Sequence, residues 1–265
     1  MENKSNFLLF FNQIISIAKN TYKESIRSRI FYILMAFAVL ILGFAVVLSF
    51  LTIGSQKRVI LDLGLAGISF FSVMTSIFVG IGLIYVEIEK KTIYNVLSKP
   101  MPRSLFIIGR YFGMMAVLGT NLLAMLLILS VLLAFFKGFT LMLFYAGFFI
   151  FMELAVITAI AIFFSSVASP VLSAICTLSF YLIGHTSSTF PEILVPLLHN
   201  ETQKKIAIAM FHLLPDLSML NVCNLITYEV PIAQGFAVRA VSYTFFYVVL
   251  LLFAACLLFR KRDLV

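Results

Sequence analysis

The side chains in this sequence that are best suited to chemistry lie inside long apolar runs. Glu153 occupies the middle of one run. In the next run, polar residues recur at every fourth position, which aligns them on one face of a helix. They are Ser173, Thr177, Tyr181 and His185. Such a face can hydrogen-bond to a second helix, or its hydroxyls can bond back to carbonyls of their own helix, and the spacing does not separate the two.

Glu153 is the acid whose position demands an explanation. An ionised acid at the centre of a membrane span costs on the order of 2.5 to 3.5 kcal/mol, so such residues face protein or water. Two roles fit Glu153: a pathway element or conformational latch, or a packing glutamate that is protonated or hydrogen-bonded. We expect it to pair with another group inside a helix bundle.

Neither metal binding nor nucleophilic catalysis is supported by the spacing of the reactive residues. The histidines are too dispersed to predict a metal site, and the cysteines have the spacing of neither a disulfide framework nor a ligand set. These residues are His185, His199, His212, Cys176, Cys223 and Cys256. We expect ordinary hydrogen-bonded histidines and small buried thiols. No catalytic triad or carboxylate pair is predicted.

The segment GRYFG at 109–113 matches the GxxxG pattern of closely packed helices. It lies near the start of a long apolar run, where chance matches are common. We expect this segment to serve helix packing rather than dimerisation.

Charge is concentrated in YVEIEKKTIYNVLSKPMPRSLFIIGR, residues 85–110. A helix beginning near Glu87 would have acids in its first turn, which suits the positive end of the helix dipole. Its apolar face would hold Ile93, Val96 and Leu97. Pro100 and Pro102 forbid continuation of the helix. The stretch therefore predicts a short, rigid amphipathic helix that can transmit force.

The composition places these elements in a membrane. Of 265 residues, 62% are hydrophobic and 11% are charged, and the mean hydropathy is +1.11. Soluble domains carry about a quarter charged residues. Continuous apolar runs indicate spanning helices, because in lipid each backbone polar group must be paired within its own segment. We predict an all-α integral membrane protein with six spans, at 30–53, 64–86, 105–134, 141–164, 170–188 and 236–259.

The first 29 residues precede the first predicted span and have an amphipathic pattern. Apolar residues between Phe7 and Ile26 recur at helical spacing. The opposite face carries Asn12, Lys19, Lys23 and Arg27. The pattern predicts a helix along the membrane surface with its bases near anionic headgroups. No short apolar region with a small-residue cleavage site comes first, so a cleavable signal is not expected.

The distribution of Lys and Arg predicts the orientation. With alternating spans, 13 of the 19 bases lie on one side, in the N-terminal segment, the 87–110 stretch and the tail, and 6 lie on the other. Because cytoplasmic loops carry the excess, both termini and the 87–110 stretch are predicted to be cytoplasmic in a bacterial plasma (inner) membrane. The net charge of +8 then reflects topology, and no nucleic-acid partner is expected.

The stretch 189–235 falls on the opposite side. Four prolines divide it into apolar pieces too short to cross the bilayer. We expect short interfacial or re-entrant helices here rather than a separate soluble domain.

Together these features resemble the permeases of ABC transporters of the type-2 exporter class. The loop of that family contains two spaced acids, then Thr, Leu and Pro, then Arg and a Gly followed by a base. The corresponding residues here are Glu87, Glu89, Thr92, Leu97, Pro100, Arg103, Gly109 and Arg110, with Thr92 one place later than the commonest spacing. IAKNTYKESIRSRIF is similar to the elbow helix of that family, and PDLSMLN resembles the copper-enzyme-maturation (nitrous oxide reductase assembly) branch. The resemblance covers nearly the whole chain, as a single permease domain.

The resemblance implies that the 87–104 loop is a coupling helix seated in a separate ATPase subunit. The implied coupling residues are Glu87, Glu89, Thr92, Ile93, Val96, Leu97, Pro100 and Arg103. It also implies two permease copies and two ATPases per assembly, with the fifth span at the dimer seam and central path. The face from Ser173 to His185 is the candidate for that seam. The chain has no GxxxxGK[ST] phosphate loop, so ATP and Mg²⁺ are expected on the partner, with no cofactor and no ATP hydrolysis in this chain.

The prediction is a permease that moves substrate across the membrane, by export, through alternating access powered by its ATPase partner. One alternative keeps the assembly but makes it a mechanotransmitter that acts on an extracytoplasmic protein through 189–235. A second alternative is an ion-coupled carrier or a polytopic membrane enzyme, which usually buries several ionisable groups. The sequence leaves the transported substrate open.

Overall fold

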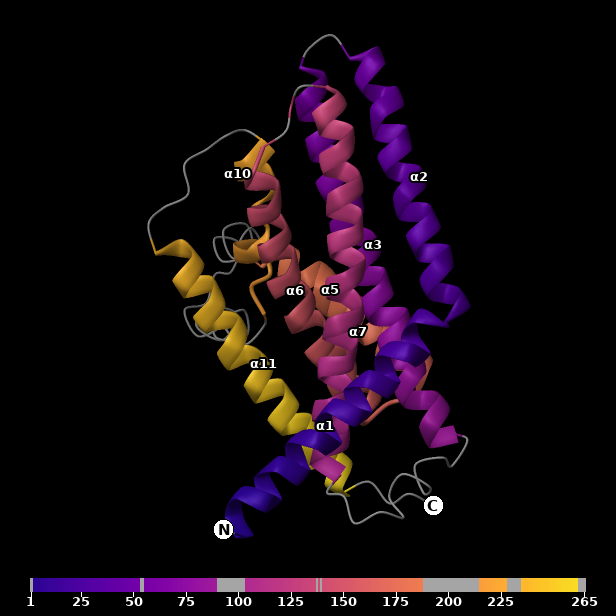
Figure 1. Cartoon of the computed structure of the whole chain (residues 1–265), viewed down its shortest axis with the longest axis vertical. Helices are drawn as coiled ribbons and strands as arrows, with labels where there is room; N and C mark the ends of the chain where they lie inside the picture. The colour runs from indigo at the N-terminus through magenta and orange to yellow at the C-terminus, as the bar shows by residue number, and fades with distance from the viewer. Residues whose placement is uncertain are drawn as a thin grey trace, which may run out of the picture.

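The computed structural model of the chain is built from helices in the part that it describes (Figure 1). That part comprises residues 2–52, 55–89, 103–136, 138, 140–187, 215–227 and 235–261. The helices are α1 (Glu2–Ile26), α2 (Arg29–Leu51), α3 (Gln56–Glu89), α5 (Arg103–Phe135), α6 (Met142–Ser165), α7 (Pro170–Thr186), η1 (Ser218–Leu220), α10 (Cys223–Thr227) and α11 (Phe236–Lys261). The all-α prediction is confirmed.

Five helices, namely α2, α3, α5, α6 and α11, are long and apolar enough to cross a membrane. They correspond to the predicted spans at 30–53, 64–86, 105–134, 141–164 and 236–259. The chain is therefore a multi-pass membrane protein.

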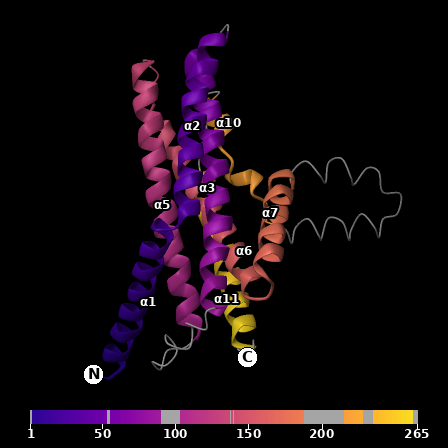
Figure 2. The same ribbon diagram turned by 90° about the vertical axis from the view of Figure 1, so that its right-hand side faces the viewer.

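The predicted span at 170–188 corresponds to α7, which has 17 residues. At about 1.5 Å per residue a helix of this length reaches about 26 Å, less than the hydrocarbon layer of about 30 Å. Figure 2 shows α7 beside α6, ending well below the upper ends of α2 and α5. Six complete spans therefore stay a prediction.

The chain ends and the charged stretch border the same end of the bundle. In Figure 1, the N-terminal end of α1 and the C-terminal end of α11 lie at the end where α3 stops and α5 begins. This arrangement agrees with the predicted alternation of the spans. Which side of the membrane this end faces stays a prediction.

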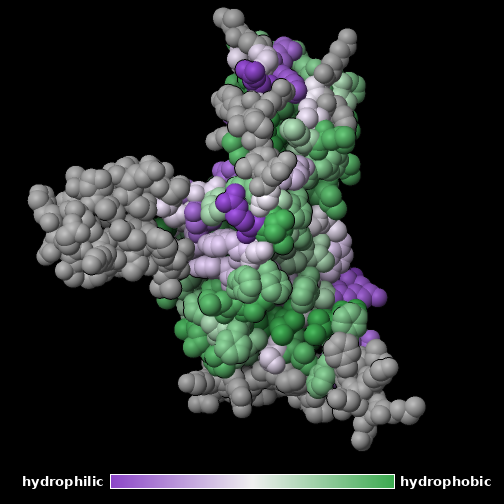
Figure 3. Space-filling view, turned by 90° about the vertical axis from the view of Figure 1, so that its left-hand side faces the viewer, coloured by the Kyte–Doolittle hydropathy of each residue, from purple (hydrophilic) through white to green (hydrophobic). Residues whose placement is uncertain are grey.

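The core of the bundle is α6, which packs against α3, α5, α7 and α11. Every residue from Glu153 to Ile162 is buried, so the helix is enclosed all round rather than on one face. By contrast, α2 and α11 expose large side chains such as Phe44, Phe50 and Phe246. On the face where α11 lies, apolar side chains form a broad patch over the lower half of the molecule (Figure 3). These peripheral surfaces suit contact with lipid.

The GRYFG segment packs α5 against α1. A Cβ added at Gly109 would lie 2.8 Å from the Cβ of Ile17, and one added at Gly113 would lie 2.7 Å from the carbonyl oxygen of Ala18. Only glycine permits this approach, because real Cβ contacts are not that short. The segment therefore serves packing, as predicted, and the packed partner is the N-terminal helix of the same chain.

An ion pair adds to this contact between α1 and α5. Arg110, with 3% of its side chain exposed, approaches Glu24 with its Nη1 atom 3.5 Å from the Oε2 atom. Its guanidinium also lies over the ring of Phe106, 5.3 Å from the centroid. The α1 helix is thus fixed to the end of the bundle from which the charged stretch emerges.

Candidate functional site

The predicted coupling residues fall partly outside the described residues. Those outside are Thr92, Ile93, Val96, Leu97 and Pro100. Glu87 and Glu89 belong to the last turn of α3, and Arg103 begins α5. The α3 helix continues to Glu89, because no glycine or proline between 83 and 89 interrupts it. The remainder of the amphipathic helix predicted for this stretch lies outside the described residues and stays a prediction.

The predicted polar face on α7 divides into two parts. Ser173 and Thr177 are fully buried within the protomer, and the Thr177 hydroxyl donates to the Ser173 carbonyl at 2.7 Å. Thr177 therefore bonds back within its own helix, which was the second interpretation of the pattern. Neither side chain is accessible to a second copy, so the assignment of these two residues to a dimer seam is corrected.

The other two residues of this face, Tyr181 and His185, lie at the C-terminal end of α7 and are half-buried. Their rings meet edge to face, with centroids 4.7 Å apart. The His185 Nε2 atom lies 2.8 Å from the Oε1 atom of Glu153 on α6. The expectation that Glu153 pairs inside the bundle is met, and its partner comes from the predicted polar face.

The Glu153–His185 contact is poorly supported by other groups. The Glu153 side chain is 2% exposed, whereas that of His185 is 21% exposed. Despite the short distance, Oε1 has no aligned hydrogen-bond donor among the described residues. The two groups are therefore close, but they are not aligned as a hydrogen bond.

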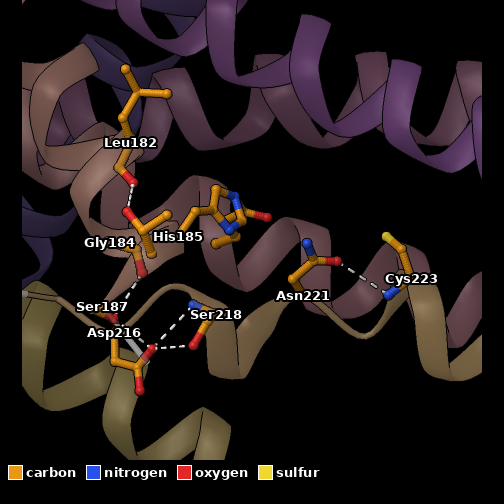
Figure 4. A network of polar contacts seen from close by, with 10 residues as sticks. Leu182, Gly184, His185, Ser187, Asp216, Ser218, Asn221 and Cys223 are labelled. Atoms are coloured by element: carbon orange, nitrogen blue, oxygen red, sulfur yellow. Dashed lines mark hydrogen bonds and ion pairs between the residues drawn. The ribbon is translucent and has the colours of Figure 1, made fainter. Parts of the chain in front are cut away.

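A second carboxylate, Asp216, lies close to the end of α7 and is well supported (Figure 4). Its Oδ1 atom accepts hydrogen bonds from the Ser187 hydroxyl at 2.9 Å, from the Ser218 N–H at 3.2 Å and from the Ser218 hydroxyl. The Asp216 N–H donates to the Tyr243 hydroxyl of α11 at 2.8 Å. These bonds tie α7, the segment 215–227 and α11 together.

The segment 215–227 returns to the bundle where α7 stops. The Leu217 N–H donates to the Gly184 carbonyl at 3.1 Å, which satisfies a carbonyl that the helix end leaves open. A Cβ at Gly184 would lie 2.8 Å from both the Pro215 oxygen and the Leu217 Cγ. Glycine at this position therefore permits the close approach. Short helices were expected within 189–235, and η1 and α10 fulfil that expectation where the structure describes the chain.

Asp216, Ser187, Ser218 and Tyr243 were not predicted as site residues. They come from three segments of the chain, and their spacing gives no common pattern. The available signal was the PDLSMLN segment, whose Asp-x-Ser order is typical of a residue that bonds its own backbone two positions on. Sequence spacing alone could not predict that Asp216 lies at the end of α7.

An apolar cavity of about 420 Å³ lies between α3 and the first half of α7. Its lining is entirely apolar in character and includes the exposed residues Phe78, Val171 and Ile175. The part of α7 that lines this cavity is thus apolar, whereas its inward face carries the buried Ser173 and Thr177 hydroxyls and the imidazole of His185.

The cysteines of the chain are free. Cys223 is buried in α10, in agreement with the expected small buried thiol, whereas Cys176 and Cys256 are half-buried. Among the described residues no three His, Cys, Asp or Glu side chains gather as metal ligands. His199 and His212 lie outside the described residues.

Comparison with known proteins gives one family. The family model described as "ABC-2 family transporter protein" matches residues 15–264. A search of curated proteins finds no match to the chain.

Proposed function

Since the chain belongs to the ABC-2 family of transporter proteins and is thus a permease subunit of an ABC transporter, we propose that it exports a substrate by alternating access. Two copies of the permease would work with two copies of a separate ATPase in a bacterial plasma membrane. ATP binding would favour one arrangement of the permease pair through contacts made in that arrangement only. The family match over most of the chain carries this proposal.

The ATPase contact is assigned to the loop between α3 and α5. Support comes from the position of the helix ends that flank it, at the end of the bundle where α1 and the end of α11 also lie. The proposed contact residues are those named from the sequence, from Glu87 to Arg103. Because the sequence predicts Leu97 on the apolar face of the loop, a charge there would oppose seating in a groove of the ATPase.

A Leu97→Asp substitution tests this assignment. We expect the variant to lose ATPase binding, or to keep it and lose stimulation of hydrolysis, because an ionised group must then be desolvated in the contact. Asn95→Asp adds the same charge on another face of the predicted helix and serves as the matched control. The measurement is co-purification with the ATPase and hydrolysis in proteoliposomes. Unchanged association and unchanged stimulation in Leu97→Asp would contradict the assignment.

The seam between two permease copies is assigned to the outward face of α7. Its exposed side chains, such as Val171, Ile175 and Leu182, are apolar and continue into the cavity beside α3. Small residues let helices approach closely in membranes, and Gly82 and Ala174 line this cavity. This assignment replaces the buried hydroxyl face that the sequence spacing suggested.

A mechanotransmitting role is the second candidate. It is favoured by the anchoring of the segment that starts at Pro215, which is tied to α7 and α11 through Asp216. A pull on the preceding stretch 188–214 would therefore reach two helices. Capture of an extracytoplasmic protein by the wild-type chain, but not by a chain lacking 189–213, would favour this role over cargo transport.

A further inference from the structure

The pair formed by Glu153 and His185 joins the centre of α6 to the end of a helix that stops inside the bundle. Glu153 lies halfway along α6, and His185 is in the last turn of α7. Discontinuous helices at mid-membrane depth leave backbone carbonyls and side chains available for ions or protons. The position is therefore one where an ionisable pair can sense a helix movement.

The two carboxyl groups near the C-terminal end of α7, those of Glu153 and Asp216, differ in the hydrogen-bond donors that surround them. Asp216 accepts hydrogen bonds from three donor groups and can keep its charge without a cation. The Oε1 atom of Glu153 has no aligned donor among the described residues, and the basic side chain recorded beside it there is the His185 imidazole. A buried carboxylate with so little support must be neutralised, either by its own proton or by a positive His185.

The short distance sets the number of protons. At 2.8 Å between Oε1 and Nε2, one proton between the two groups gives attraction and a net charge of zero. Without that proton, the carboxylate faces a nitrogen lone pair, and with a second proton the pair carries a buried positive charge. The closed contact is therefore most favourable when Glu153 and His185 together hold one titrating proton.

The surroundings supply little compensation for a change of charge. The titratable side chains recorded around the pair, or bonded to residues next to it, are weak acids or carboxylates in the described segments. They are Tyr181 on α7, Cys223 on α10, Asp62 on α3, Tyr111 on α5, and Asp216 and Tyr243 at the break. In these described segments no Lys or Arg side chain is recorded in contact with Glu153. His185 is thus the basic side chain on which Glu153 depends.

We propose that Glu153 and His185 form a buried proton-binding site in which uptake or release of a proton weakens the hold of α6 on the end of α7. The ligand is the proton itself, and its two binding atoms are Oε1 and Nε2. Separation of α7 from α6 changes the proton number of the pair, and a change of proton number shifts the balance toward separation. The site belongs to this chain alone and does not depend on an ATPase.

Cys223 offers a native reporter for the movement. Its side chain is buried in α10, close enough to Glu153 for the two to interact electrostatically. In a Cys176→Ser/Cys256→Ser background, its alkylation rate in lipid nanodiscs measures the separation of the end of α7 from α6. Dividing by the rate of the detergent-unfolded protein at the same pH removes the effect of thiolate chemistry.

Measured from about pH 5 to pH 9, the protection of Cys223 is expected to pass through a maximum, as for a pair of groups that act with one shared proton. Protection falls about three- to tenfold on either side of its maximum, the factor that one interhelical side-chain contact contributes in membranes. The Glu153→Gln/His185→Gln variant keeps two polar side chains of similar shape but does not titrate. Its profile is expected to be flat.

A second reporter and a second method distinguish a local movement from misfolding of the whole chain. A chain that retains Cys256 alone, on α11, should give the same rate ratio with and without the two Gln substitutions. Infrared difference spectra of the wild-type chain across the same pH range should contain a carboxyl band that the Glu153→Gln variant lacks. Three outcomes would overturn the proposal. They are a protection of Cys223 that does not change with pH in the wild type, an equally pH-dependent protection in the double variant, and the absence of a carboxyl band that depends on Glu153. Each of these outcomes leaves the assignment of the ATPase contact untouched.

Discussion

Exposure makes the two members of the buried pair unequal. Glu153 is 2% exposed, so its carboxylate cannot turn to water if His185 is lost. His185 is 21% exposed and lies at a helix end, where it has an alternative environment if Glu153 is lost. The free energy of unfolding should therefore respond differently to removal of each partner.

We expect His185→Leu to destabilise the protein by about 1 to 3 kcal/mol, because it leaves a buried acceptor without a partner. Glu153→Leu should cost less, since it removes the buried acid itself and fills an apolar site. The chain contains no tryptophan, so loss of helix followed by circular dichroism is the suitable measurement. Equal destabilisation by the two substitutions would show that Glu153 is not the dependent member.

At the scale of elements, the α1–α5 contact depends on small residues on both helices. The buried hydroxyls of Thr21 and Ser25 bond to carbonyls of their own helix at 2.9 and 2.8 Å, so they present a compact surface. Gly109 and Gly113 provide the matching surface on α5. Such contacts exclude any added methyl group unless the helices separate.

A Gly113→Leu substitution should lift α1 from α5. The added side chain would enter space held by Ala18, whose backbone cannot withdraw without moving the helix. Gly43→Leu on α2 is the control, because nothing lies within 4 Å of a Cβ at that position. Alkylation of a Ser25→Cys reporter, at a site that is fully buried, should rise several-fold with Gly113→Leu only.

Two further outcomes bear on this prediction. Both leucine variants should elute as the same monodisperse species as the wild type, which shows that the bundle persists. A Ser25→Cys reporter that stays protected with Gly113→Leu would mean that α1 is held by other contacts.

The elements that the sequence predicted well are those with one dominant physical signal. The five long spans follow from apolar length alone, and α1 follows from its amphipathic spacing. The α3 helix continues to Glu89, past the predicted end of its span at 86, because a change from apolar to charged residues does not stop a helix, whereas Gly or Pro does. The meeting of Gly184 with Leu217 could not be predicted, since hydropathy carries no information on which segments touch.

At the scale of the whole molecule, α7 separates two surfaces. Its inward side carries buried hydroxyls, and its outward side carries exposed apolar residues that border the cavity beside α3. The sequence spacing identified a polar face correctly but not its direction. In a membrane, an outward polar face would be costly, so polar residues turn toward the protein unless a second copy covers them.

Two single-cysteine variants, one on each face of α7, test the proposed permease dimer. In a cysteine-free background, Ile175→Cys should give a symmetric cross-linked dimer, because this position is 56% exposed. Ser173→Cys should give none, because the residue is fully buried within its own protomer. The measurement is gel mobility after oxidation in membranes. A dimer from Ser173→Cys, or none from Ile175→Cys, would place the seam elsewhere.

The hydrogen bond from the Leu217 N–H to the Gly184 carbonyl has a consequence for how this chain tolerates change. Because this bond holds together the described residues on either side of 188–214, we expect that stretch to tolerate insertions and deletions. Its length and content can vary without shifting the register of any membrane helix, since its two ends stay together. Sequence changes confined to that stretch are therefore expected to leave the membrane helices in place.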